Sequence, residues 1–153
     1  EVDARYRVWR DIEAFGVFTW MDGEVETYPT SEAKLVAEPI DRLMPPTGRF
    51  GFRWDHSCTG SPGEGGRYWI EAACTAAAKA DKLSTRDKAD TSRIPPGGTP
   101  GYAVYEVRAG WDYRDSLALS VALENVTDED YRIHGSGVNE PGRNLVVAVE
   151  TVF

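Results

Sequence analysis

Cysteine, histidine and positive charge are all scarce in this sequence. Only Cys58, Cys74, His56 and His134 could supply thiol or imidazole ligands among 153 residues, and no CxxC or HxxxH spacing marks a metal site. The residues therefore indicate no bound metal or cofactor. The formal net charge of −8 argues against a nucleic-acid partner, because such a surface needs a basic patch.

Long hydrophobic runs are absent as well. No stretch of about 18 apolar residues occurs, so no transmembrane helix is predicted. A membrane is not thereby excluded, since a barrel strand needs about 9–11 residues, of which only every second one is apolar. The chain begins without methionine or a signal peptide, inside the alternating segment Val2–Val8. We interpret it as one domain-like unit whose upstream part is missing; a processed N-terminus is the alternative.

Alternation of apolar and polar residues dominates what is present, and it predicts β-strands with two unlike faces. Connections after the first, third and fifth strands are shorter, whereas those after the second, fourth and sixth are longer and more polar. Because alternate connections of an antiparallel meander lie at the same end, short turns are predicted at one rim and long loops at the other. The seven strands are Val2–Trp9, Glu13–Glu26, Thr47–His56, Arg67–Ala77, Tyr102–Tyr113, Ser116–Asn125 and Asn144–Phe153, and the long loops are Thr27–Pro46, Ala78–Gly101 and Val126–Gly142.

One segment conflicts with this pattern. Glu71–Leu83 is rich in strong helix formers, and local propensity alone favours a helix there. Pairing with neighbouring strands can override propensity, so we expect a strand as far as Ala77. The link Ser57–Gly66, rich in glycine, serine and proline, predicts a loop, and Arg114-Asp115 a tight turn.

The two faces of these strands differ in chemistry. Charged side chains gather on one face, where they cannot lie unpaired in a dry core but can line a watery interior. The apolar face could meet lipid or the facing layer of a β-sandwich. Trp54, Trp111 and Tyr113 lie toward the short-turn end, as an aromatic girdle would, although aromatic residues favour strands in general. The charged set is Arg5, Arg7, Arg49, Arg53, Glu71, Glu106, Arg108, Asp112, Glu124 and Glu150.

Several local motifs favour structure over chemistry. The acidic stretch Asn125–Asp130 could bind calcium, but its spacing differs from an EF-hand and a structured turn is favoured. Gly135–Gly142 is a turn-rich loop and no phosphate cradle. Cys58 lies in a turn, roughly 20 Å along the strand direction from Cys74, and a disulfide needs Cα atoms within about 7 Å. We therefore predict that these two cysteines are not bonded. For His134, we expect a solvated position in the last long loop.

The closing segments resemble a known family. Leu123–Val146 contains ENVTDEDYR followed by EPGRN, and the final strand ends on an aromatic residue, Phe153. This combination resembles the end of TonB-dependent outer-membrane receptors. Ile94–Gly110, Thr19–Glu24 and Arg42–Phe50 are similar to earlier strands and loops of that family, so the resemblance covers most of the chain.

The resemblance implies that residues 1–153 are the C-terminal part of a 22-stranded transmembrane β-barrel, without its plug and earlier strands. It implies an outer-membrane location and TonB-energised uptake of an iron–siderophore complex, haem or cobalamin. The three long loops would be extracellular. Leu145, Val147, Val149 and Phe153 resemble the signal read by the barrel assembly machinery. Expected partners are outer-membrane lipid, that machinery, TonB through the missing plug, and the ligand.

The implied site is for binding, and no enzyme activity is expected. His134, Asn139 and Arg143, in and beside the last long loop, are candidate ligand contacts. The main alternative is a soluble antiparallel β-sandwich or small barrel that acts as a ligand-binding module. A weaker one is a small hydrolase that uses His56 or His134, for which no third partner lies at a useful spacing.

Overall fold

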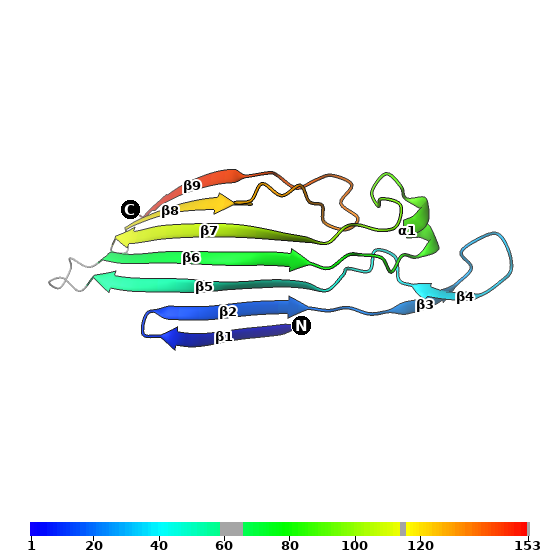
Figure 1. Cartoon of the computed structure of the whole chain (residues 1–153), viewed down its shortest axis with the longest axis horizontal. Helices are drawn as coiled ribbons and strands as arrows, with labels where there is room; N and C mark the ends of the chain where they lie inside the picture. The colour runs from blue at the N-terminus through cyan, green and yellow to red at the C-terminus, as the bar shows by residue number, and fades with distance from the viewer. Residues whose placement is uncertain (59–65, 114–115, 153) are drawn as a thin grey trace.

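A single antiparallel sheet of seven strands makes up most of the computed structural model, which describes residues 1–58, 66–113 and 116–152 (Figure 1). Each strand pairs with the next sheet strand along the chain, in the order β1-β2-β5-β6-β7-β8-β9. The predicted all-β antiparallel meander of seven strands is therefore confirmed. The strands are β1 (Val2–Trp9), β2 (Ile12–Thr19), β5 (Thr47–Cys58), β6 (Gly66–Ala77), β7 (Tyr102–Tyr113), β8 (Leu117–Glu124) and β9 (Asn144–Thr151).

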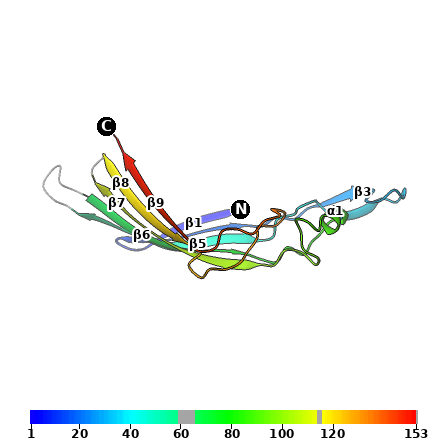
Figure 2. The ribbon, with the colours of Figure 1, turned by 90° about the horizontal axis from the view of Figure 1, so that it is seen from above.

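The sheet is long and curved (Figure 2). The three central strands, β5, β6 and β7, have 12 residues each, which corresponds to about 40 Å of extended chain. We call the end at which β5 leads to β6 and β7 to β8 the turn end. The other is the loop end, where the connections after β2, β6 and β8 gather (Figure 1).

The second predicted strand is too long. It was expected to reach Glu26, but β2 ends at Thr19, which is opposite Thr47, the first residue of β5. Pro45 and Pro46 precede Thr47 and have no amide hydrogens to donate, so β5 cannot extend the ladder farther. Beyond Gly23 the chain forms a separate hairpin of β3 (Glu24–Thr27) and β4 (Val36–Pro39). Most of β3 occupies the end of the predicted second strand, whereas β4 lies inside the predicted loop Thr27–Pro46.

The helix-forming stretch Glu71–Leu83 is strand as far as Ala77, as predicted. A short helix does occur, but later, as α1 (Thr85–Ala89). Ser84 caps it: the Ser84 hydroxyl accepts from the Asp87 amide at 3.1 Å, and the Asp87 carboxylate accepts from the Ser84 amide at 3.2 Å. This capping box fixes the start of the helix at Thr85.

Buried apolar side chains lie mainly at the loop end. Leu43, Ala80, Leu83 and Ile94 are each at most 8% exposed, and all four belong to the connections rather than to the sheet. The core of the described residues is therefore small and sits between loops. Within those residues, no helix is long and apolar enough to cross a membrane.

The register explains why Cys58 and Cys74 do not form a disulfide. Cys58 is opposite Gly66, whereas Cys74 is opposite Phe50, eight positions farther along the ladder. Both cysteines are free, as predicted. The predicted turn Arg114-Asp115, most of the Ser57–Gly66 link and the terminal Phe153 lie outside the described residues.

Candidate functional site

One face of the sheet is apolar across all seven strands, and we call it the apolar face. The register aligns Trp54, Ile70, Ala109, Val121 and Val147 in one row across five strands. These side chains are not packed under another layer, since Ile70 is 48% exposed and Val147 68% exposed. A soluble sheet normally covers such a face, so the exposed row marks a surface made for an apolar partner.

Aromatic rings on the apolar face gather toward the turn end. Trp54 stacks on His56 with ring centroids 5.5 Å apart, and Tyr68 stacks on Trp111 at 6.2 Å. Trp111 also contacts Tyr113, at 5.4 Å. The predicted band therefore consists of two stacked groups, Trp54 with His56 and Tyr68 with Trp111 and Tyr113, which adjoin where His56 is in register with Tyr68. His56 is part of it, which leaves the imidazole in an aromatic stack instead of a catalytic cluster.

The opposite face, which we call the charged face, carries a row of alternating charge. Arg7, Glu13, Arg53, Glu71 and Arg108 are cross-strand neighbours in this order over five strands. Directly opposed unlike charges stabilise a sheet pair by about 0.2–1 kcal/mol each. The sequence shows which residues are charged, but only the register shows that their signs alternate.

Ion pairs extend from this row along the strands. The Arg49 guanidinium contacts both Glu71, at 2.8 Å, and Glu106. Arg53 reaches Glu71 at 3.4 Å, and Arg108 reaches Glu106 at 2.8 Å. The carboxylates of Glu71 and Glu106 are only 14% and 16% exposed, so they are compensated where solvent access is limited.

Two aromatic residues lie on the charged face because glycine makes room for them. The Trp69 ring lies under the Arg53 guanidinium at 4.3 Å and over Gly110, where an added Cβ would come within 2.3 Å of the ring. Phe15 lies in the same way under Arg49, at 5.0 Å. These cation–π contacts hold the arginines flat against the sheet. The sequence pattern missed them, since Phe15 and Trp69 break the polar alternation.

The two segments that carry the family resemblance, ENVTDEDYR and EPGRN, are hydrogen-bonded to each other at the loop end. Asn125, in a left-handed conformation with φ of 48°, donates to the carbonyls of Glu129 and Pro141 at 2.8 and 3.2 Å. Asp128 accepts from the Arg143 amide at 2.8 Å. The side chains that could have held calcium are thus used to close the loop 125–143. Among the described residues, no group of three or more acidic, histidine or cysteine side chains could hold a metal ion.

His134 lies inside the loop cluster, which corrects the expectation of a solvated surface position. The residue is 6% exposed, and Nδ1 of its ring shares a 2.8 Å hydrogen bond with the hydroxyl of buried Thr99. Burial lowers the pKa of His134; nearby Asp87 opposes this and Arg42 adds to it. The imidazole therefore joins two of the long loops in its neutral form.

The other predicted ligand contacts point to a structural role as well. Asn139 bonds Arg132 at 2.9 Å and Asp130 at 2.6 Å, and the Arg143 guanidinium donates to the Val126 carbonyl at 3.0 Å. Within the described chain, no hydrogen bond or ion pair joins these residues to His134. Their role as ligand contacts stays a prediction. Leu145, Val147 and Val149 of the predicted assembly signal project from the apolar face of β9, each at least 64% exposed.

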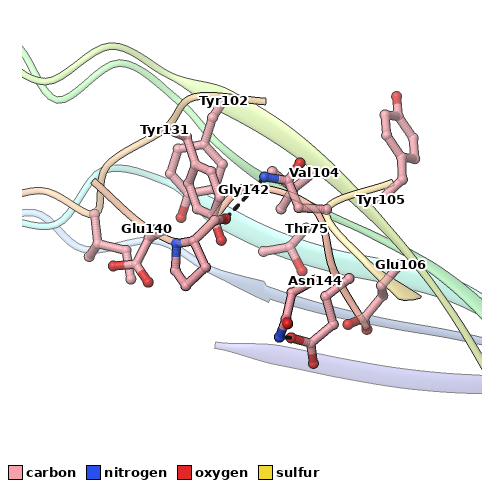
Figure 3. A pocket seen from close by; sticks show the side chains of 13 residues that line it. Thr75, Tyr102, Val104, Tyr105, Glu106, Tyr131, Glu140, Gly142 and Asn144 are labelled. Carbon is pink, nitrogen blue, oxygen red and sulfur yellow. Dashed lines mark hydrogen bonds between the residues drawn. The ribbon is translucent and has the colours of Figure 1, made fainter. Parts of the chain in front are cut away.

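A cavity of about 400 Å³ opens on the charged face at the loop end (Figure 3). Tyr102 of β7 and Tyr131 of the last loop form one wall, with ring centroids 4.5 Å apart. Glu140 lies beside them, and Glu106 and Asn144 lie farther along the strands (Figure 3). Sequence reasoning missed this cavity, because its walls come from positions up to 69 residues apart, Thr75 to Asn144.

Comparison with known proteins supports the same architecture. No protein-family model matches the sequence, and no curated protein sequence matches it. Among solved structures, the copper transporter OprC is similar, with a TM-score of 0.69 over 96% of this chain and 15% sequence identity. The chain folds like a segment of that transporter. It spans 22% of the transporter's length, and at this identity the likeness concerns the fold.

Proposed function

We propose that this chain is a wall segment of an outer-membrane transporter barrel of the TonB-dependent type. The observation that carries the proposal is an exposed apolar face over seven strands, opposite a face on which charged side chains lie in register over five of them. A barrel strand needs this arrangement, because one face meets hydrocarbon and the other faces a wet interior. The similarity in fold to a transporter supports it.

Strand length and aromatic placement agree with a bilayer. The 12-residue strands exceed the roughly 9–11 residues that a tilted barrel strand needs. With the turn end on the periplasmic side, the aromatic band lies at the periplasmic interface of the membrane. The loop end, with α1 and the β3–β4 hairpin, then faces the outside of the cell. The charged face then lines the lumen, where Arg49, Arg53 and Arg108 meet water or a plug.

Strand parity constrains how the barrel closes. In a bacterial antiparallel barrel the strand number is even, so a seven-stranded segment must be completed by an odd number of further strands. A barrel of 22 strands would need 22 − 7 = 15 more. We propose that these strands and a plug belong to the same protein, that TonB acts through the plug, and that Leu145, Val147, Val149 and Phe153 are read by the barrel assembly machinery.

We propose a metal-containing nutrient as the cargo. The resemblance in sequence favours an iron–siderophore complex, haem or cobalamin, and the protein of similar fold is a copper transporter. All of these cargoes contain a transition metal, and the proposed class of cargo is defined by that shared metal. Transport requires binding and rearrangement, without covalent chemistry.

The soluble β-sandwich would need a second layer on the apolar face. Val121, Val147 and Val149 are 41%, 68% and 64% exposed, so in the described part of the chain they are not packed beneath a helix or sheet. This exposure favours the membrane over the soluble alternative.

Location and uptake can be tested in cells. The protein that contains this chain should fractionate with the outer membrane, and Asn139→Cys, at the loop end, should react with an impermeant maleimide in intact cells, in a background with Cys58 and Cys74 replaced by serine. Cells with the protein should accumulate a labelled copper or iron complex faster than cells without it, and an uncoupler of the inner membrane should abolish the difference. Recovery in the soluble fraction would contradict the proposal.

A further inference from the structure

We propose that the cavity between Tyr102, Tyr131 and Glu140 binds an organic cation, a protonated amine or guanidinium joined to an apolar group. The cavity, of about 400 Å³, falls within the range of small-molecule sites. Neither the fold similarity nor the resemblance in sequence assigns a ligand to it.

The carboxylates of the cavity come from three elements and differ in how they are compensated. Glu106 of β7 is paired with Arg49 and Arg108. Glu124 of β8 is 3.9 Å from Arg108 and accepts a 3.3 Å bond from Asn144. These two carboxylates are already paired with arginines of the charged face. They make the electrostatic potential of the cavity negative, but they are not free to bind a ligand.

Glu140 differs because no cation pairs with it in the part of the chain that the structure describes. Its amide donates to the Tyr131 carbonyl at 2.9 Å, which fixes the acid next to the tyrosine pair. The nearest arginines in sequence are engaged elsewhere, Arg132 with Asn139 and Arg143 with the Val126 carbonyl. Glu140 is a half-buried residue, and its carboxylate is uncompensated beside two aromatic rings.

The pKa of the Tyr131 hydroxyl reflects the electrostatic potential inside the cavity. Burial raises its pKa, and the carboxylates of Glu140, Glu124 and Glu106 raise it further. An anionic occupant would meet the same repulsion, whereas a cation would be attracted by the carboxylate and by the ring faces. Val104 and Ile133 complete an apolar wall for the uncharged part of the ligand.

Two probes of nearly equal shape and opposite charge test the sign. Tryptamine carries an ammonium group on an indole ring, and indole-3-propionate carries a carboxylate on the same ring at a similar distance. Isothermal titration of the purified protein that contains this chain, in detergent micelles, should show binding of tryptamine, and weaker or no binding of indole-3-propionate. Equal affinities, or no binding of tryptamine, would overturn the proposal.

Matched variants locate the site. Glu140→Gln should weaken tryptamine binding about five- to tenfold, because one uncompensated charge is lost while the shape is kept. Glu129→Gln removes an exposed carboxylate of the same loop outside the cavity and should leave the affinity unchanged. Tyr131→Phe should bind like the parent chain, whereas Tyr131→Leu should lose the cation–π contribution. An unchanged affinity in Glu140→Gln would refute the assignment, whether or not the protein proves to be a transporter.

Discussion

Replacing Leu145 by arginine should destabilise the protein in a bilayer, whereas the same change at Val146 should not. The two residues are adjacent on β9 and lie on opposite faces, with Leu145 64% and Val146 40% exposed. Leu145 is in register with Leu123, and Leu123 with Val107, so Leu145→Arg places a charge on the apolar face and Val146→Arg on the charged face at nearly the same depth.

The depth sets the magnitude. Val107 is four residues from Trp111 of the aromatic band, which is about 13 Å along the strand and about 10 Å in depth at a tilt near 45°. The apolar band of a barrel is about 25 Å tall, so Val107 lies near its middle, and Leu145, two strands away in the same register row, lies within the band. Arginine there should cost about 2–4 kcal/mol. In water, a substitution at an exposed site changes stability by no more than about 0.5 kcal/mol.

Equilibrium unfolding from phospholipid vesicles, followed by tryptophan fluorescence in a denaturant series, measures the difference directly. Using the purified protein that contains this chain, refolded into vesicles, also avoids any effect of Leu145 on cellular assembly. If the free energies of unfolding of the two variants agreed within about 0.5 kcal/mol, the apolar face would not lie in hydrocarbon.

Three further predictions concern the charged face and the loops. Glu71→Gln should lower the free energy of unfolding by about 1–3 kcal/mol, since it weakens two arginine contacts at a carboxylate that is 14% exposed, and Glu150→Gln on exposed β9 should have little effect in the same assay. Asn125→Ala removes three hydrogen bonds from a left-handed residue, so the loop 125–143 should be cut faster in limited proteolysis while the sheet stays intact. Burial lowers the pKa of His134, so below pH about 6.5 the unfolded chain binds the extra proton first, and stability should be full above that pH and decline below it. The protection factor of the Thr99 amide, which corrects for the intrinsic pH dependence of exchange, should fall on acidification in the parent chain but not in His134→Gln.

Alternation was enough to predict the sheet, since every second residue of β5 to β9 lies on the same face. It was also enough at Glu71–Ala77, where pairing on both sides outweighs helix propensity. It failed where pairing depends on the partner: β2 stops because Pro45 and Pro46 precede its neighbour, and no pattern within β2 itself contains that information.

The candidate site was less accessible to sequence reasoning. The alternating row from Arg7 to Arg108 needs the register of five strands, and the burial of His134 needs two loops to meet. The cavity wall of Tyr102 and Tyr131 joins residues 29 positions apart that carry no shared motif. Gly110, under the ring of Trp69, gives a signal that could be sought elsewhere: a glycine within a strand beside an aromatic residue at a polar position.

Spin-label accessibility along β9 tests the central claim most directly. Single labels at residues 144–151, in a chain with Cys58 and Cys74 replaced by serine and embedded in a bilayer, should show collisions with oxygen that rise at Leu145, Val147 and Val149. Collisions with a water-soluble nickel complex should rise at the positions between them, with a period of two residues. A profile in which the nickel complex reaches both sets equally would contradict the assignment of the apolar face to lipid.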